Sequence, residues 1–407
     1  MARSSVRRIT LGSAGPEDMA RPQLAARGAG TLRIIPVEGA RQLRQFIDVP
    51  WQVYDRRAHP QWVPPLRLMV REALDTRRNR FYARADRALW VALRSGRPVG
   101  RIAAIENRAH NNFHGDRVGF FGFFEALDDQ EAATALVDTA AEWLRARGLT
   151  ALRGPVSPST NHECGLLVRG FEAHPTFMTS WNPQYYPALL EGAGLAGVKD
   201  LLGYFVPMDD PRFVLPARFE SHARRARARQ RLTFRDLDMR RWKQEVALCW
   251  DVYNGAWEAN WGFVPMARDE FEQMADGLKH IVSPRLAFAA EIDGEPAGVC
   301  LAVPDYNELL KRIPSGRLLP TGLAKILLGR RRLRTARVMM LGVKPQIRGT
   351  GIFALITHEL YRRGRESGVI GGEASWILED NELMNRPLRA LGLEEYRRWR
   401  IYEKPLA

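Results

Sequence analysis

The chain has 407 residues, which exceeds one average hydrophobic core and is enough for two domains. Its cysteines, Cys164, Cys249 and Cys300, are far apart and form no C-x-x-C pair, which argues against a disulfide framework or a metal site and fits a reducing cytoplasm. The formal net charge of +15 predicts an anionic partner: coenzyme A, an acidic carrier protein, anionic lipid or nucleic acid.

The N-terminal segment is basic. Residues 1–30 contain five arginines and lack the apolar core of a secretory signal, so we expect a disordered arm. No apolar run in the sequence approaches the ~18–20 residues that cross a bilayer. These features predict a cytoplasmic protein.

The first half of the chain, residues 31–210, has the element order of a mixed sheet with flanking helices. A strand, a turn and a second strand are predicted over 88–105, and a further strand over 118–125. A helix is predicted over 131–147 and another strand over 151–155.

A polar loop follows the last of these strands, from Ser157 to Gly165. Polar side chains after a strand can line a pocket, and His162 or Glu163 could handle a proton there. A structural turn is the alternative interpretation.

A basic linker is expected over residues 211–240. Between residues 218 and 231 the sequence has six arginines and one glutamate. A helix of this composition is either a solvated linker or a patch for lipid headgroups or an acidic carrier protein.

The second half, residues 241–407, repeats features of the first at an offset of 198 residues. Gly96, in a turn between two strands, corresponds to Gly294, and Gly194 corresponds to Gly392. One offset at both ends indicates a duplication. The fold class expected is therefore α/β (α+β), with two tandem domains that each have a mixed central sheet and flanking helices.

The second half also contains a basic, leucine-rich insertion at residues 305–337. Residues 307–337 hold nine lysines or arginines and one acidic residue, Glu308. Such a segment fits an element at a membrane interface, although its leucines could instead cap the local core. Nucleic acid is disfavoured as its partner, because residues 307–337 include no aromatic side chain that could stack on a base.

A glycine turn follows the insertion and is the most informative motif. Residues 338–343 are an apolar run of strand type, and Gln346, Gly349 and Gly351 then form a Q-x-x-G-x-G pattern. From Ile352 onward apolar residues recur at helical spacing. A strand, a glycine turn and a helix N-terminus point several backbone N–H groups and the positive end of the helix dipole at a bound phosphate.

This pattern resembles the acyl-CoA pyrophosphate loop of the GNAT acyltransferase superfamily, and the resemblance extends over roughly residues 285–404. It implies acyl-CoA, or an acyl-carrier-protein thioester, as co-substrate, with no permanently bound cofactor. The residues assigned to donor binding are Leu341, Gly342, Val343, Gln346, Ile347, Arg348, Gly349, Thr350, Gly351, Ile352 and Asn381. Many relatives carry a tyrosine seven residues after the asparagine, which protonates the departing thiolate. Leu388 stands there, so the general acid is left open.

The first half lacks this motif. At the corresponding place residues 125–130 read Glu-Ala-Leu-Asp-Asp-Gln, with three carboxylates and no glycine. Carboxylates would repel a pyrophosphate. We therefore expect a degenerate N-terminal domain that has lost CoA binding and shapes the acceptor pocket.

Acyl transfer to an amine needs a polarised thioester carbonyl and a group that takes a proton. Residues 339–343 would supply backbone groups to the pantetheine arm and the thioester oxygen. Glu379, at the end of the next predicted strand, is a candidate base beside His162 and Glu163. Its alternative interpretation is a surface carboxylate near a helix start.

Segments 114–125, 181–186 and 376–381 are similar to a group of bacterial tandem GNAT-like proteins that includes the bacterial ceramide synthases. These enzymes attach a long fatty acyl group to the amine of a sphingoid base. The resemblance implies an N-acyltransferase for a lipid amine, peripheral on the inner membrane. Two alternatives stay open: a soluble GNAT acetyltransferase for an amino acid, antibiotic or protein amine, and an inactive tandem GNAT that serves as a binding module.

Overall fold

The computed structural model describes residues 30–216, 220–221, 225, 231–258, 260–347 and 351–406. The expected N-terminal arm, except its last residue, and most of the arginine-rich part of the expected linker therefore lie outside the described residues. The same holds for three residues of the predicted donor loop, Arg348, Gly349 and Thr350.

Strands of the first half are β1 (Leu32–Pro36), β2 (Ala85–Arg94), β3 (Arg97–Asn107), β4 (Val118–Ala126), β5 (Ala151–Gly154), β6 (Val156–Ser157), β7 (Glu163–Cys164), β8 (Leu166–Arg169) and β9 (Ala196–Val206). Strands of the second half are β10 (Leu232–Asp236), β11 (Ala287–Ile292), β12 (Glu295–Pro304), β13 (Thr335–Val343), β14 (Gly371–Leu378) and β15 (Glu395–Pro405). The strands predicted in the first half are thus confirmed as β2 to β5.

Helices of the first half are α1 (Ala40–Asp48), α2 (Pro50–Val53), α3 (Arg67–Ala73), α4 (Arg108–His114), α5 (Gln130–Arg145) and α6 (Tyr186–Gly192), with a 3₁₀ turn at Arg80–Ala83. Helices of the second half are α8 (Trp242–Trp257), α9 (Arg268–Leu278), α10 (Asn307–Leu310), α11 (Gly322–Gly329), α12 (Ile352–Glu366) and α13 (Glu382–Ala390). Short 3₁₀ turns occur at Met239–Arg241, Pro284–Leu286, Arg330–Arg332 and Pro345–Ile347. Among the described residues, none of these helices has the length and apolar character needed to cross a bilayer.

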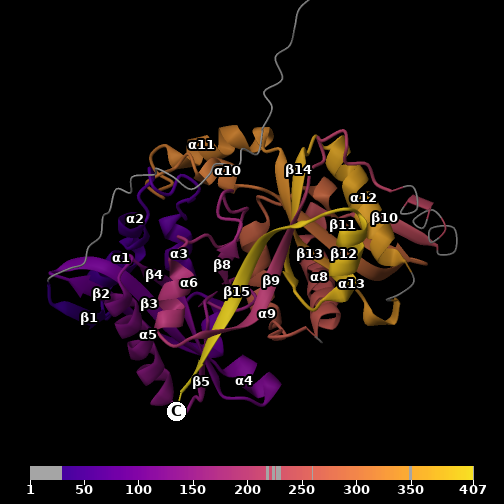
Figure 1. The fold of residues 1–407 in the computed structure, drawn as a ribbon. Coiled ribbons are helices and arrows are strands. Elements are labelled where there is room, and N and C mark those ends of the chain that lie inside the picture. Colours follow the sequence, from indigo (N-terminus) through magenta and orange to yellow (C-terminus); the bar gives the residue numbers. More distant parts are fainter. Residues whose placement is uncertain are drawn as a thin grey trace, which may run out of the picture.

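One mixed sheet extends through both halves of the molecule (Figure 1). Its strand order is β1-β2-β3-β4-β5-β15-β9-β14-β13-β12-β11-β10, with β8 beside β15. The large mixed sheet with helices is the fold class that the sequence predicted.

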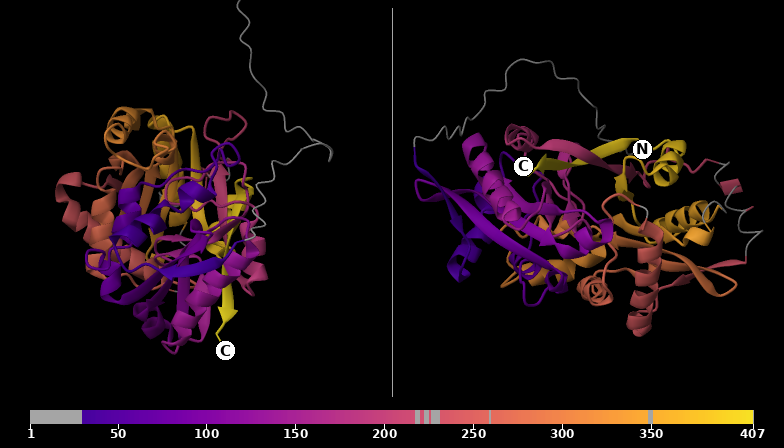
Figure 2. Two further views of the ribbon diagram at one scale, coloured as in Figure 1. Left: turned by 90° about the vertical axis from the view of Figure 1, so that its left-hand side faces the viewer. Right: turned by 90° about the horizontal axis from the view of Figure 1, so that it is seen from below.

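The two halves exchange their last strands. β15, the final strand of the chain, pairs with β5 of the first half, with Tyr402 opposite Gly154. β9, the final strand of the first half, pairs with β14 of the second, with Leu202 opposite Ile377. β9 and β15 lie side by side at the centre of the sheet (Figures 1 and 2). Each half therefore supplies a strand to the sheet of the other half. The domain ranges 31–210 and 241–407 remain a prediction.

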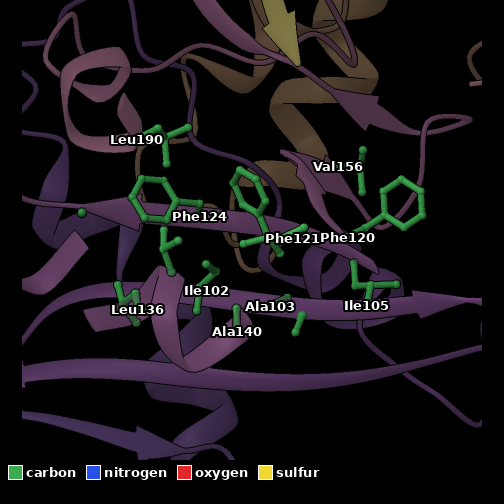
Figure 3. Close-up of a cluster of buried hydrophobic side chains, with 14 of the residues drawn as sticks. Ile102, Ala103, Ile105, Phe120, Phe121, Phe124, Leu136, Ala140, Val156 and Leu190 are labelled. Carbon is green, nitrogen blue, oxygen red and sulfur yellow. The ribbon is translucent and has the colours of Figure 1, made fainter. Parts of the chain in front are cut away.

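The core of the first half forms where α5 packs on β3 and β4. Asp129 begins α5 by accepting a hydrogen bond from the Ala132 N–H at 3.1 Å. Leu136, one of the apolar residues that recur at helical spacing along α5, is buried against Ile102 of β3 (Figure 3). The helix predicted over 131–147 is thus confirmed.

Helices cover both faces of the second-half sheet, because alternate residues of each strand point to opposite sides. In β11, Ala287 and Ala289 belong to the hydrophobic cluster of α8 and α9. Phe288 and Ala290 belong to the cluster of α12. The site described below lies on the side of α8 and α9.

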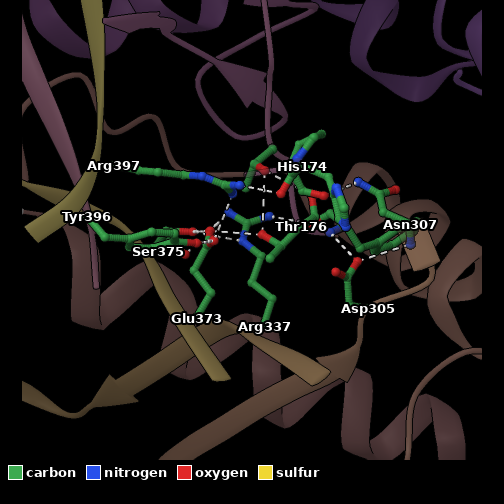
Figure 4. Close-up of polar contacts among 12 residues, drawn as sticks. His174, Thr176, Asp305, Asn307, Arg337, Glu373, Ser375, Tyr396 and Arg397 are labelled. Atoms are coloured by element: carbon green, nitrogen blue, oxygen red, sulfur yellow. Dashed lines mark hydrogen bonds and ion pairs between the residues drawn. The ribbon is translucent and has the colours of Figure 1, made fainter. Parts of the chain in front are cut away.

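A buried polar network joins the first-half segment 174–178 to the second half (Figure 4). Glu373 of β14 accepts hydrogen bonds from Thr176 Oγ1 at 2.8 Å and from Arg397 Nη1 at 3.1 Å. Asp305 Oδ1 accepts the backbone N–H groups of Phe177 at 2.9 Å and Asn307 at 3.0 Å. Buried charges of this kind are stable only when they are paired, so the network fixes the segment in place.

Asp305 makes the stability of the fold depend on pH. Burial, with Glu308 and Glu373 nearby, raises its pKa to about 7, whereas an unfolded aspartate titrates near ~3.9. The folded state therefore holds the proton more tightly, and this group's contribution to stability falls as the pH rises from ~4 to about 7. Asp305→Asn keeps the acceptor oxygen and removes the titration. We expect its melting temperature to decline less than that of the wild type between pH 5 and pH 8, and equal declines would contradict this.

Candidate active site

β13 and β14 separate in the middle of the sheet. They pair in parallel only from Thr335 to Val338, opposite Gly371 to Ala374. Beyond that point β13 pairs only with β12 and β14 only with β9. A bulge opposite β12 leaves Met339 without a counterpart. Bulges often lie beside active sites, and here the facing strand edges leave backbone groups free for a ligand.

A cavity of about 720 Å³ lies at this opening, within the size range of small-molecule sites. Its walls come from α8, α9, β13, β14 and the start of α12 and α13, together with residues 160–162 and Cys164. Most lining side chains are apolar or aromatic, and they include Val246, Tyr253, Trp257, Phe263, Phe271, Met274, Leu278, Met339, Met340, Phe353 and Ile377. The space therefore suits a largely hydrocarbon ligand with few polar groups.

The N-terminus of α12 opens into the cavity. Gly351 precedes the helix with φ 87°, a left-handed conformation that favours glycine, and as the N-cap residue it supplies no side-chain cap to the first turn. The residues from Gly351 to Ala354 line the cavity. Their backbone N–H groups and the helix dipole form a site for an anion.

The structure brings together most of the described residues that the sequence assigned to donor binding. The cavity lining includes Leu341, Gly342, Val343, Gly351, Ile352 and Asn381. Asn381 also caps α13, because its Oδ1 accepts the Met384 N–H at 3.3 Å. Gln346 and Ile347 lie in the 3₁₀ turn before the glycines and outside the lining.

His162 is the one candidate base that lines the cavity. Its Nδ1 lies 2.8 Å from the Ser159 hydroxyl oxygen. Burial lowers the pKa of His162 to about 4, so the imidazole is neutral near pH 7. A neutral imidazole facing a cavity can accept a proton.

The two candidate carboxylates lie elsewhere. Glu379 is exposed at the end of β14, where its Oε1 accepts the Asp200 N–H at 3.1 Å, and it does not line the cavity. Glu163, on β7, is also outside the lining. The surrounding protein raises the pKa of Glu163, and the nearby Arg337 guanidinium opposes that rise.

Two curated bacterial proteins are similar to this chain over most of its length. The bacterial ceramide synthase of Caulobacter vibrioides is 34% identical over 382 residues, which cover 92% of this chain and 98% of that protein. The chain belongs to the bacterial ceramide synthase family. Protein YghO of Escherichia coli is 34% identical over 370 residues, covering 89% of this chain and 93% of its own. No protein-family model matches the chain.

Solved structures show the fold of this ceramide synthase relative. A tandem GNAT protein from the clavulanic acid biosynthesis pathway superposes with a TM-score of 0.55 at 15% identity, covering 93% of this chain and 99% of that one. A GCN5-related N-acetyltransferase from Sphaerobacter thermophilus has a TM-score of 0.53 at 13% identity, covering 92% and 96%. At these identities the likeness concerns the fold alone, which is that of tandem GNAT proteins.

The corresponding opening in the first half is filled by the chain itself. β4 and β5 pair in parallel only from Val118 to Phe120 and then separate. A Cβ atom on Gly122 would lie 1.5 Å from the Val156 carbonyl oxygen, so β6 occupies the gap. The Phe123 N–H donates to Ser157 Oγ at 3.0 Å. Asp129 also caps α5, because its Oδ1 accepts the Ala132 N–H at 3.1 Å.

Trp376 of β14 brings a further polar group to the cavity of this ceramide synthase relative, and no pattern in the sequence predicted it. It lines the cavity, yet its Nε1 is buried without a hydrogen-bond partner in the described part of the chain. The Arg337 guanidinium lies 4.7 Å from the centre of its ring and holds it in place. A buried donor without a partner costs about 1–3 kcal/mol, so this N–H is poised for an acceptor atom of a ligand.

We expect Trp376→Phe to raise the KM of one substrate roughly three- to tenfold, the value of one net hydrogen bond, without lowering the melting temperature. The ring stays and only the N–H is lost. Trp261→Phe, in the same cavity wall, is the matched control. Steady-state kinetics and thermal melts check the result. A lower melting temperature with unchanged KM would mean that the indole serves the fold and not the ligand.

Proposed function

We propose that the protein transfers a long-chain acyl group from acyl-CoA to the amine of a lipid, and that this lipid is a sphingoid base. One observation carries the proposal: a mainly apolar cavity of about 720 Å³ reaches the N-terminus of α12, where the N-cap residue Gly351 supplies no side-chain cap. A fatty acyl-CoA has a matching anionic head and hydrocarbon tail. The similarity to the ceramide synthase of Caulobacter vibrioides supports the lipid amine as acceptor.

The donor would lie along the open edge of β13. Its pyrophosphate would bind at the turn before α12. The donor-binding residues proposed there are Gln346, Ile347, Arg348, Gly349 and Thr350. Its pantetheine arm would meet the backbone of residues 339–343 and the side chain of Asn381, all of which line the cavity. The bulge at Met339 turns backbone groups toward the thioester, where an N–H would polarise the carbonyl. A carrier-protein thioester would present the same arm.

His162 would handle the proton. The amine nitrogen attacks the thioester carbonyl carbon, a C–N bond forms, the C–S bond breaks, and the nitrogen loses one proton to the imidazole. Burial disfavours the imidazolium, so the proton passes on readily. The departing thiolate, with an ordinary pKa of ~8.5, takes it. This route needs no tyrosine at Leu388, which is buried in an apolar cluster. Glu163 remains a second proton carrier in the proposal, and Glu379 is left out because it lies away from the cavity.

The first half would serve the acceptor. Its own opening is filled by β6, and Asp129 occupies the place of a phosphate at α5. Residues 160–162, Cys164, Met178 and Leu201 of this half nevertheless line the cavity of the second half. This supports a degenerate N-terminal domain that shapes the acceptor side. Because both substrates would be lipids, we assign the protein to the cytoplasmic face of the inner membrane as a peripheral protein.

Thiol release from a ladder of acyl-CoA donors, acetyl to C18, tests this function with and without sphinganine in detergent. We expect release that requires both a long donor and the long-chain base, with ceramide as the acylated product. Release from acetyl-CoA with a soluble amine would favour a soluble acetyltransferase. Tight CoA binding without any release would favour an inactive binding module.

A further inference from the structure

Four leucines of the insertion face solvent. The exposed fractions are 73% for Leu319, 43% for Leu323, 51% for Leu327 and 79% for Leu328. Large apolar side chains that gather on a surface mark a site of interaction. They are not left over from a poorly packed core, because other apolar residues of the insertion, Leu309, Leu310 and Ile313, are buried beneath them.

The glycines of α11 explain why the leucines point outward. The residues of this helix that are buried are its end residues, Gly322 and Gly329. A Cβ atom on Gly329 would lie 2.4 Å from Leu309, and one on Gly322 would lie 2.4 Å from the Arg317 carbonyl oxygen. Glycines therefore let the helix lie close to the core, and the leucines occupy the opposite face. This arrangement is the reverse of an ordinary surface helix, which buries its apolar face.

A second apolar segment comes from the first half of the chain. Leu68 and Met69 of α3 are exposed by 50% and 44%. α3 is fastened to the insertion, because the Arg67 N–H donates to the Gly316 carbonyl at 2.9 Å and Arg67 Nε donates to the Ser315 carbonyl at 2.8 Å. The two segments thus form one surface from parts of the chain that are about 250 residues apart.

Cations without acidic partners accompany these apolar side chains. The exposed cations of α3 and the insertion are Arg71, Arg312, Arg317, Lys325, Arg330, Arg331, Arg332 and Arg334, and none forms an ion pair with a carboxylate in the described ranges. The insertion's two acidic residues point inward: Asp305 is buried, and Glu308 accepts the Thr335 N–H at 3.2 Å. Glu72 of α3 is the exposed acidic residue of the two helices. The surface therefore complements an anionic one.

The same surface lies next to the wall of the cavity. The hydrophobic cluster beneath the insertion includes Leu278 and contacts Met178, Val282, Leu301 and Met339. All five also line the cavity. β13 begins at Thr335, within the last residues of the insertion, and ends at Val343, just before the predicted donor turn. The exposed leucines and the anion site therefore lie toward opposite ends of one strand.

We propose that α3 and the insertion form a docking surface for an anionic lipid bilayer, consisting of Leu68, Met69, Leu319, Leu323, Leu327, Leu328 and the cations named above. The apolar side chains enter the interfacial region and the cations contact lipid phosphates. Docking in this orientation sets the acceptor end of the cavity against the membrane and leaves the anion site for a water-soluble CoA head. The inference rests on the proposed function for the lipid substrate, but binding to the bilayer can be tested apart from it.

Co-sedimentation of the full-length protein with vesicles tests the surface. We expect binding to phosphatidylcholine vesicles that contain phosphatidylglycerol, weaker binding to phosphatidylcholine alone, and release by salt. Leu327→Glu with Leu328→Glu, and separately Leu68→Glu with Met69→Glu, should each lower the vesicle partition coefficient about tenfold or more. Phe113→Glu is the matched control, because Phe113 is 42% exposed on α4, on the far side of the molecule from α11 (Figure 1).

Several outcomes would contradict the proposal that this surface docks on a bilayer. Unchanged binding by both double variants would do so, as would equal loss in the Phe113 control. Loss of binding to an acidic carrier protein, with vesicle binding intact, would assign the surface to a protein partner instead. Should a leucine variant unfold, reversal of Arg330, Arg331 and Arg332 to glutamate alters exposed side chains alone and decides the question by the same partition measurement.

Thiol release with a short, water-soluble donor and amine separates this inference from the proposed function. Docking variants that lose vesicle binding should keep this release at the wild-type rate, because the active site is untouched. A protein that shows no thiol release with any lipid amine, yet loses vesicle binding in the variants, would refute the proposed function and leave the docking surface standing.

Discussion

Gly351→Asp is expected to weaken CoA binding about 100-fold, which corresponds to about 2.7 kcal/mol. Gly351 is the N-cap residue of α12, with φ 87°, and it supplies no side-chain cap to this helix. An aspartate there would accept the free N–H groups and place a carboxylate where the pyrophosphate binds. In the first half an aspartate already holds the equivalent position, because Asp129 caps α5 in this way.

Gly351→Asn is the matched control for this prediction. Asparagine has nearly the shape of aspartate and tolerates the left-handed region better than most residues, but it carries no charge. Calorimetric titration with CoA should show a much smaller loss of affinity for the asparagine variant. Equal losses would assign the effect to backbone strain, and unchanged affinity in both variants would refute the assignment of the turn to the donor.

The donor side of the site could be predicted because its signals are local. A strand, a glycine turn and a helix N-terminus follow one another in the sequence, so residues 341–343 and Gly351 could be assigned together, and all of them line the cavity. Periodicity also gave α5 and the strands before it. Local patterns of this kind need no knowledge of partners distant in the chain.

The strand order, the unpaired N–H of Trp376 and the exposure of the insertion's leucines depend on contacts between distant segments of the chain. The constant offset of 198 residues indicated two similar halves, but it could not indicate that β9 and β15 exchange places, since strand pairing is decided by the whole sheet. Trp376 carries no motif, and its missing hydrogen-bond partner is visible only in three dimensions. The leucines of the insertion likewise fitted a core or a membrane surface equally well. The structure excludes the core for Leu319, Leu323, Leu327 and Leu328, which are exposed while the glycines of α11 are buried, and the membrane surface is the proposal made above.

His162→Gln is expected to lower kcat about 10²–10⁴-fold, the usual contribution of a general base, while CoA affinity stays within about twofold of the wild type. Ser159→Ala should cost less. It keeps the imidazole but removes the hydroxyl that lies 2.8 Å from Nδ1 and orients the ring. Steady-state kinetics with a long-chain base and calorimetry with CoA measure the two effects separately.

The pH dependence distinguishes His162 from Glu163 as the base. With a pKa of about 4, His162 is neutral from pH 6 to pH 9, so the ratio of wild-type to His162→Gln kcat/KM should stay constant over that range. Comparing two enzymes on one substrate cancels the titration of the amine itself. The pKa of Glu163 is raised above that of an ordinary carboxyl group, so a base at that position would lose activity as the pH falls. A wild-type to Glu163→Gln ratio that falls toward pH 6, with a His162→Gln ratio near one, would transfer the role to Glu163.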